Sequence, residues 1–99
     1  KLSFRNTILD ADSLTIFTNG QTYELPQKEF QILFKLLSYE NKIFTRVQLM
    51  DEFWGIYSTS EERTVDTHIN RLRDKFKNNP DFTIVTIRGL GYKAVKNHD

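Results

Sequence analysis

Cysteine is absent from this 99-residue sequence. Disulfides, thiolate zinc sites and cysteine nucleophiles are therefore excluded, and a reducing compartment such as the cytoplasm suits the chain. Long apolar runs are missing too, since runs such as residues 32–34 are far too short for a membrane span or a signal-peptide core. We expect no membrane partner.

Linkers and internal repeats are also lacking, because no Pro-, Gly- or Ser-rich stretch divides the chain. A length of 99 residues is common for one domain, and an apolar content of 38% with eight Phe and four Tyr can supply its core. We expect residues 1–99 to form one domain. Because the sequence opens at Lys1 rather than Met, we also expect it to be part of a longer protein.

Net positive charge is small, at +1, but the charged residues are unevenly distributed along the chain. Residues 1–62 hold six Lys/Arg and nine Asp/Glu, whereas residues 63–96 hold eight Lys/Arg and three Asp/Glu. Positive potential is thus concentrated in the C-terminal third, where it would attract an anionic partner such as a nucleic acid.

Alternating residues in the first 25 positions predict short strands at 2–4, 7–9, 14–17 and 22–25. Asn19-Gly20 separates two of these runs, and both residues tolerate the positive φ angles of a type I′ hairpin turn. A small antiparallel sheet is therefore expected to open the domain.

Two helices are predicted next. From Pro26 the apolar spacing changes to i, i+3, i+4 and i+7, which predicts an amphipathic helix to about residue 39, ended by Asn41. Its apolar positions are Phe30, Leu33, Phe34 and Leu37. Thr45 and Gln48 form a capping-box pattern that starts a second helix, which Gly55 ends. The expected buried side of this helix consists of Val47, Leu49, Met50, Phe53 and Trp54.

A third helix and a terminal hairpin complete the prediction. Thr59 and Glu62 are a second capping-box candidate for a helix at about 61–77, which the Asn-Asn-Pro sequence at 78–80 stops. Alternation at 82–87 and 91–95 predicts two strands joined at 88–90, where Gly89 and Gly91 suit a tight turn. Strands, three helices and a hairpin in this order indicate an α+β fold.

The third helix combines an apolar stripe with a polar face. The stripe that is expected to face the core consists of Val65, Ile69, Leu72 and Phe76. The opposite face consists of Arg63, Thr67, Asn70, Arg71 and Asp74, flanked by Thr64, His68, Arg73, Lys75 and Lys77. A helix fits the major groove of DNA, where Arg reads guanine, Asn reads adenine and Thr meets the thymine methyl group, while the flanking groups can hold phosphates.

This polar face is equally typical of a solvated amphipathic helix. The neighbouring elements favour the groove-binding interpretation, because the second helix precedes the third across a short loop in helix-turn-helix order. Arg88 at the tip of the hairpin is placed for an adjacent minor groove, where the negative potential is strong. A solubilising turn residue is the alternative for Arg88.

Two C-terminal segments carry a family pattern: RTVDTHINRLRDKF at 63–76 and IVTIRGLGY at 84–92. They resemble the OmpR/PhoB-type winged-helix effector domain of bacterial two-component response regulators. The resemblance covers nearly the whole chain, and the upstream matches, in the same order, are Leu25, Glu29-Phe30, Ile32-Leu33, Thr45-Arg46, Leu49 and Phe53-Trp54-Gly55. It implies a winged helix-turn-helix with an N-terminal four-stranded antiparallel sheet, three helices and a C-terminal β-hairpin wing.

The resemblance also implies sequence-specific double-stranded DNA binding for transcriptional regulation, with no cofactor. The third helix, at about 61–77, would read the major groove, and the wing, at about 86–92, the adjacent minor groove. The positions that would face bases are Thr67, Asn70, Arg71 and Arg88. Those that would contact the DNA backbone or groove edge are Trp54, Arg63, Thr64, His68, Arg73 and Thr86. The loop that would face RNA polymerase contains Ile56, Tyr57, Ser58, Thr59 and Ser60.

Further partners follow from the same resemblance. A receiver domain that accepts a phosphoryl group from a cognate sensor histidine kinase would precede residue 1, as part of a phosphorelay. Tandem dimers would bind direct-repeat promoter sites. Two residues depart from the family pattern: Pro26 replaces the usual Ser or Thr cap, and Asn70 stands where relatives often have a basic residue.

Two other functional classes would require different residues. An enzyme would need residues such as Asp10 with Asp12, Asp51 with Glu52, or His68, but no metal ligand set or nucleophile with a base accompanies them. A winged helix that binds only protein would instead expose apolar residues on the third helix. His68 is a groove-edge donor or a solvated histidine, and Trp54 is expected to be mostly buried with its indole N–H free for a phosphate.

Overall fold

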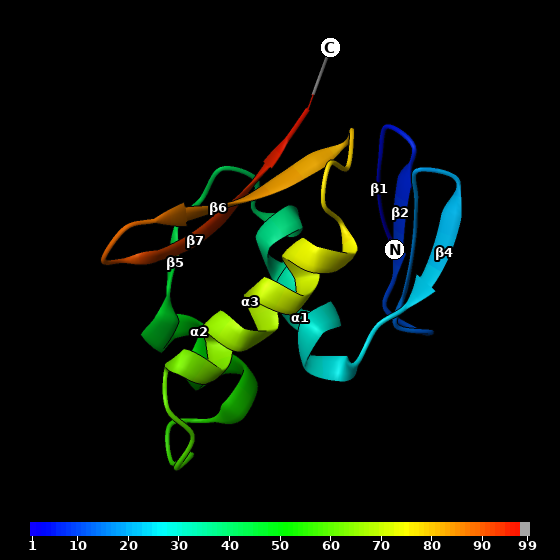
Figure 1. Cartoon of the computed structure of the whole chain (residues 1–99). Coiled ribbons are helices and arrows are strands. Elements are labelled where there is room, and N and C mark those ends of the chain that lie inside the picture. Colours follow the sequence, from blue (N-terminus) through cyan, green and yellow to red (C-terminus); the bar gives the residue numbers. More distant parts are fainter. Residues whose placement is uncertain (98–99) are drawn as a thin grey trace.

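Four short antiparallel strands open the computed structural model, which describes residues 1–97 (Figure 1). They form one sheet in chain order, with β1 at Leu2–Phe4, β2 at Thr7–Asp10, β3 at Thr15–Thr18 and β4 at Gln21–Glu24. Asn19 and Gly20 have φ angles of 49° and 78°, which confirms the predicted hairpin turn. β3 begins at Thr15, one residue later than predicted, because the φ of 55° at Leu14 is incompatible with a strand.

The three predicted helices are present. They are α1 at Gln27–Ser38, α2 at Arg46–Trp54 and α3 at Arg63–Lys75. Thr45 and Gln48 form the predicted capping box at the start of α2, and Gly55 ends it with a φ of 91°. Asn41 adopts the expected left-handed conformation, with a φ of 65°. Pro26 is the N-cap of α1, and its carbonyl accepts the first intrahelical bond from Phe30 N at 3.0 Å. Its side chain makes no capping hydrogen bond.

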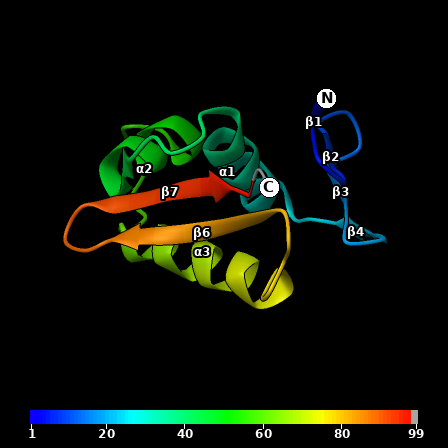
Figure 2. The ribbon, with the colours of Figure 1, turned by 90° about the horizontal axis from the view of Figure 1, so that it is seen from above.

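The C-terminal hairpin belongs to a second sheet. β6 at Phe82–Ile87 pairs with β7 at Gly91–Lys96, and β7 also pairs with β5, a two-residue strand at Phe44–Thr45 that the sequence did not reveal. The sheet order is therefore β5-β7-β6. In Figure 2 the hairpin crosses the view with α3 on one side and α1 and α2 on the other, and the N-terminal sheet stands at one end.

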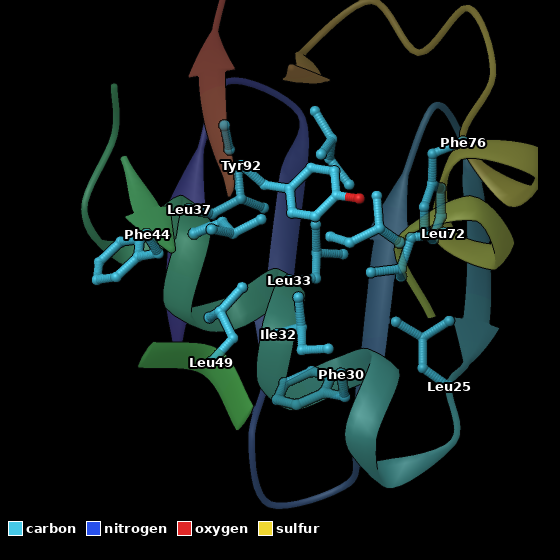
Figure 3. Close-up of a cluster of buried hydrophobic side chains, with 14 of the residues drawn as sticks. Leu25, Phe30, Ile32, Leu33, Leu37, Phe44, Leu49, Leu72, Phe76 and Tyr92 are labelled. Atoms are coloured by element: carbon cyan, nitrogen blue, oxygen red, sulfur yellow. The ribbon is translucent and has the colours of Figure 1, made fainter. Parts of the chain in front are cut away.

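The core is centred on α1, which packs against α2, α3 and β7 (Figure 3). The predicted stripe of α1 is buried except for the half-buried Phe34, but Ile32 and Leu36 are fully buried as well. A second buried stripe arises because this helix is enclosed on more than one side. The predicted stripe of α3 is confirmed, since Val65, Ile69, Leu72 and Phe76 are all buried.

Three local predictions were wrong. Val47 is 49% exposed, because the buried side of α2 is narrow and is formed by Leu49 and Met50. α3 begins at Arg63 and ends at Lys75 rather than spanning 61–77, with Glu62 as an N-cap that makes no side-chain bond and no capping box from Thr59. Gly91 is needed for close backbone approach to β5 and not for a turn, whereas Gly89 does have a positive φ of 75°.

A buried polar network joins the N-terminal sheet to the segment before β6. Asp81 is only 1% exposed, and its Oδ2 accepts from Thr7 Oγ1 at 2.7 Å and Asn6 N at 3.0 Å. Thr7 Oγ1 also lies 2.6 Å from Thr18 Oγ1, and Arg5 Nε lies 3.3 Å from Asp81 Oδ1. A single carboxylate thus holds residues that are more than 70 positions apart in the chain.

Candidate nucleic-acid interface

The outer face of α3 carries three of the predicted base-facing residues. Thr67, Asn70 and Arg71 are all exposed. Thr67 Oγ1 donates to the Arg63 carbonyl at 3.1 Å, so its hydroxyl can still accept a hydrogen bond and its methyl group can meet an apolar partner. Within residues 1–97, Asn70 and Arg71 have no side-chain hydrogen bond or ion pair. Their donors and acceptors are therefore available to a ligand.

The predicted groove-edge residues Trp54 and His68 lie together where α1, α2 and α3 meet. The Trp54 and His68 rings pack edge to face with centroids 5.2 Å apart, and His68 Nδ1 lies 2.7 Å from the Thr64 carbonyl. Lys28 of α1, which sequence reasoning missed, places its ammonium 5.5 Å from the Trp54 ring centroid and donates to the Phe53 carbonyl. Both residues are partly buried, and Trp54 packs against the core, as the expectation of a mostly buried ring requires.

Arg73 and Thr86, also predicted at the groove edge, contact each other. Arg73 Nη2 donates to Thr86 Oγ1 at 2.5 Å, and Nε and Nη2 donate to the Ile84 carbonyl at 3.3 and 3.2 Å. The guanidinium therefore joins α3 to β6. Lys75 is likewise engaged within the protein, since its ammonium lies 2.5 Å from the carboxylate of buried Glu29 in α1.

Arg88 lies exposed at the wing tip, which Figure 1 shows projecting beyond α3. No ion pair or hydrogen bond involves its side chain among residues 1–97. The loop between α2 and α3 projects at a different end of the molecule (Figure 1), and in it Ile56 is 69% and Tyr57 92% exposed. Two separate surfaces are thus free for partners.

Asp66 of α3 contacts both Arg46 of α2 and Tyr92 at the base of the wing. Arg46 Nε lies 2.7 Å from Asp66 Oδ1, and the Tyr92 hydroxyl donates to the same oxygen. Burial raises the pKa of Asp66, but the hydrogen bonds from Tyr92 and Arg46 and the Arg46 charge outweigh it, so the pKa lies below its ordinary value of 3.8. Burial and the bond to Asp66 raise the pKa of Tyr92 above 10.0.

Acid is expected to weaken the domain partly through Asp66. Because its folded pKa is depressed, its stabilisation is complete above about pH 5 and is lost as pH falls through 3.8 toward the folded value. Urea unfolding midpoints measured from pH 7 to pH 3 should fall less for Asp66→Asn than for the parent. Equal falls would contradict this role.

For Tyr92 the raised pKa predicts stabilisation that is complete below about pH 9 and is lost as pH rises through 10.0.

Two of the acidic residues named as catalytic candidates, Asp10 and Glu52, have local structural contacts. Asp10 Oδ1 accepts from Asp12 N at 3.0 Å in the turn after β2, and Glu52 pairs with Lys35 at 3.1 Å. Over the described part of the chain, no group of three His, Asp or Glu side chains is arranged to hold a metal ion. Among residues 1–97 no helix has the length and apolar character to span a bilayer.

Comparison with known proteins identifies relatives along the whole chain. The family model described as "Transcriptional regulatory protein, C terminal" matches residues 20–94. The heme response regulator HssR of Staphylococcus aureus (strain JH9) is 43% identical over 99 residues, which cover 99% of this chain and 44% of HssR. The chain therefore spans less than half the length of such curated relatives.

Solved structures show the same fold. The response regulator DrrB, a Thermotoga maritima OmpR/PhoB homologue, superposes with a TM-score of 0.80 at 35% identity, covering 95% of this chain and 43% of DrrB. The DNA-binding domain of Klebsiella pneumoniae RstA, in complex with the RstA box, superposes with a TM-score of 0.80 at 27% identity over 95% of each chain. With the family match, these likenesses show that the chain belongs to the transcriptional regulatory protein C-terminal family, as an OmpR/PhoB-type winged-helix DNA-binding domain and not an enzyme.

Proposed function

We propose that this domain recognises a specific duplex DNA sequence by placing the outer face of α3 in the major groove and Arg88 in the adjacent minor groove. The observation that carries the proposal is that Asn70, Arg71 and Arg88 are exposed and have no side-chain partner within residues 1–97. A guanidinium can read guanine and a carboxamide adenine, while a narrow minor groove attracts arginine.

The remaining predicted contacts would fix the position of the domain on the DNA backbone. Arg63 is exposed at the start of α3, and Thr64, His68 and Trp54 form one flank of the outer face. Phosphate contacts of this kind supply much of the affinity and make it salt-dependent without selecting a sequence. The RstA domain, solved in complex with the RstA box, supports this interpretation by its fold.

Replacing Arg71 with alanine is expected to relax selectivity at one base pair, at a cost of about 1–3 kcal/mol for the preferred site, because the bidentate contact is lost. The measurement is selection from a random duplex pool at fixed moderate salt, performed with the parent and with Arg71→Ala, followed by sequencing of the retained DNA. One position of the enriched motif should become degenerate in the variant.

Arg63→Ala is the matched control, since it removes an arginine from the same helix at a proposed phosphate contact. It should weaken all sequences about equally and leave the motif unchanged. An identical motif for Arg71→Ala and the parent would contradict base reading by Arg71. A parent that enriches no motif would favour a winged helix that binds protein.

We also propose that residues 1–99 act as the output domain of a longer response regulator, after a receiver domain that a cognate sensor histidine kinase phosphorylates in the cytoplasm. The chain's 44% share of the length of HssR supports a second domain. Tandem dimers on direct repeats would then gain affinity through high effective concentration. Selection from a random duplex pool tests the dimer, since it should enrich repeats in the same orientation about one helical turn apart. Phosphotransfer from the kinase to the full-length protein tests the receiver domain.

The loop between α2 and α3 is proposed to contact RNA polymerase. It combines the exposed apolar side chains of Ile56 and Tyr57 with neighbouring Ser58, Thr59 and Ser60, and it projects away from the wing. Exposed aromatic and aliphatic side chains of this kind are typical anchors of protein interfaces. Unchanged capture of polymerase by a DNA-bound Tyr57→Ala variant would contradict this role.

A further inference from the structure

Tyr92 occupies an unusual position at the base of the wing. It is only 4% exposed, and its ring belongs to the buried cluster shown in Figure 3. Two guanidinium groups lie near that ring, with the carbon atoms of Arg46 and Arg73 5.9 and 5.5 Å from its centroid. A cation near the face of an aromatic ring is attracted to it, most strongly where water is excluded.

The Tyr92 hydroxyl attaches β7 to α3. It donates to Asp66 Oδ1, the same oxygen that Arg46 Nε approaches to 2.7 Å. Arg46 is the first residue of α2, and the residue before it, Thr45, pairs with Gly91 of β7. Tyr92 therefore ties together the start of α2, the first part of α3 and the strand that leaves the wing tip.

Arg73 attaches the other strand of the wing. Its guanidinium donates to the Ile84 carbonyl and to Thr86 Oγ1 on β6, and Thr86 is the cross-strand partner of Tyr92. Both strands of the wing are thus fixed to α3 just before the tip, β7 through Tyr92 and Asp66 and β6 through Arg73. We call the set of Arg46, Asp66, Arg73, Thr86 and Tyr92 the wing clamp.

We infer that the wing clamp fixes the position of Arg88 relative to the outer face of α3, so that the minor-groove and major-groove contacts act as one unit. This inference rests on the proposed function and deepens it, because it assigns Arg73 and Tyr92 as positioning residues that need not touch DNA. A contact held in place before binding costs less conformational entropy on binding, so the wing contributes affinity only while it is held.

Tyr92→Phe tests the inference because it removes the hydroxyl that bonds to Asp66 and keeps the ring beside both guanidinium groups. Tyr23→Phe is the matched control, since it removes a hydroxyl that donates to Gln21 Oε1 at 2.8 Å in the N-terminal sheet. In the parent and in the control, Arg88→Ala should weaken binding to the selected site by about tenfold. In Tyr92→Phe the same change should weaken it by less than about threefold, while the effect of Arg71→Ala stays as in the parent.

Two results would overturn the inference. The first is an effect of Arg88→Ala that is as large in Tyr92→Phe as in the parent, which would leave Tyr92 a purely structural residue. The second comes from the free domain: hydrogen exchange at residues 87–91 should be faster in Tyr92→Phe than in the parent and in Tyr23→Phe, and equal rates would show that no clamp holds the wing. If Arg88→Ala has no effect even in the parent, the proposed minor-groove role fails, and the exchange measurement still decides the clamp.

Discussion

Gly91→Ala is expected to destabilise the domain by about 3 kcal/mol or more, because the new methyl group has no space. A Cβ at this position would lie 2.0 Å from the Phe44 carbonyl oxygen and 2.8 Å from Thr45 Cα. Both are backbone atoms of β5, so no side-chain rotation relieves the clash. The pairing of β5 with β7 must separate, and with it the attachment of the wing to the start of α2.

Urea unfolding of Gly91→Ala beside Gly89→Ala measures this effect. Gly89 has a φ of 75°, but a Cβ there meets nothing within 4 Å. Alanine at 89 should therefore cost only the about 1–2 kcal/mol of a left-handed backbone conformation. A loss for Gly91→Ala no larger than that for Gly89→Ala would show that β5 can move away from β7 at little cost.

Asp81→Ala is expected to lower stability by about 3 kcal/mol, because it removes the acceptor of a buried network. The Asn6 N–H would lose its 3.0 Å partner and Thr7 Oγ1 its 2.7 Å partner. The Arg5 guanidinium, 3.3 Å from the carboxylate, would lose this ion pair. The N-terminal sheet should loosen first, since this network connects it to the segment before β6.

The unfolding free energies of Asp81→Ala and Asp74→Ala should differ strongly. Asp74 is an exposed aspartate on α3, and its loss should change stability by less than about 0.5 kcal/mol. Hydrogen exchange should report the largest change in β1 and β2 for Asp81→Ala. Similar stabilities of the two variants would mean that water replaces the Asp81 carboxylate without cost.

Local sequence patterns were sufficient for most of the fold. The Asn19-Gly20 turn, the capping box of Thr45 and the apolar stripe of α3 each depend on residues a few positions apart, and each was confirmed. The outer face of α3 followed directly from its stripe, because fixing the buried side of a helix also fixes the exposed side. The DNA contacts of Asn70, Arg71 and Arg88 remain predictions.

Features that depend on distant residues could not be predicted. The strand β5 exists only because β7 lies beside it, and two residues carry no periodicity of their own. Asp81 and Tyr92 bond to partners 75 and 26 positions away, and no spacing rule connects such pairs. For the same reason the hydrogen bonds from the Arg73 guanidinium to β6 could not be predicted, and its groove-edge role remains a prediction.

The ion pair between Lys75 and buried Glu29 has a consequence for the response of the domain to ionic strength. The slope of log affinity against log salt concentration reflects the counterions that the protein displaces from DNA, about 0.9 for each neutralised phosphate. Because Lys75 already neutralises a carboxylate inside the protein, we expect it to displace none. A count of the basic residues of α3 would then overestimate the salt sensitivity of binding, and we expect the domain to keep more of its affinity at high salt than its composition suggests.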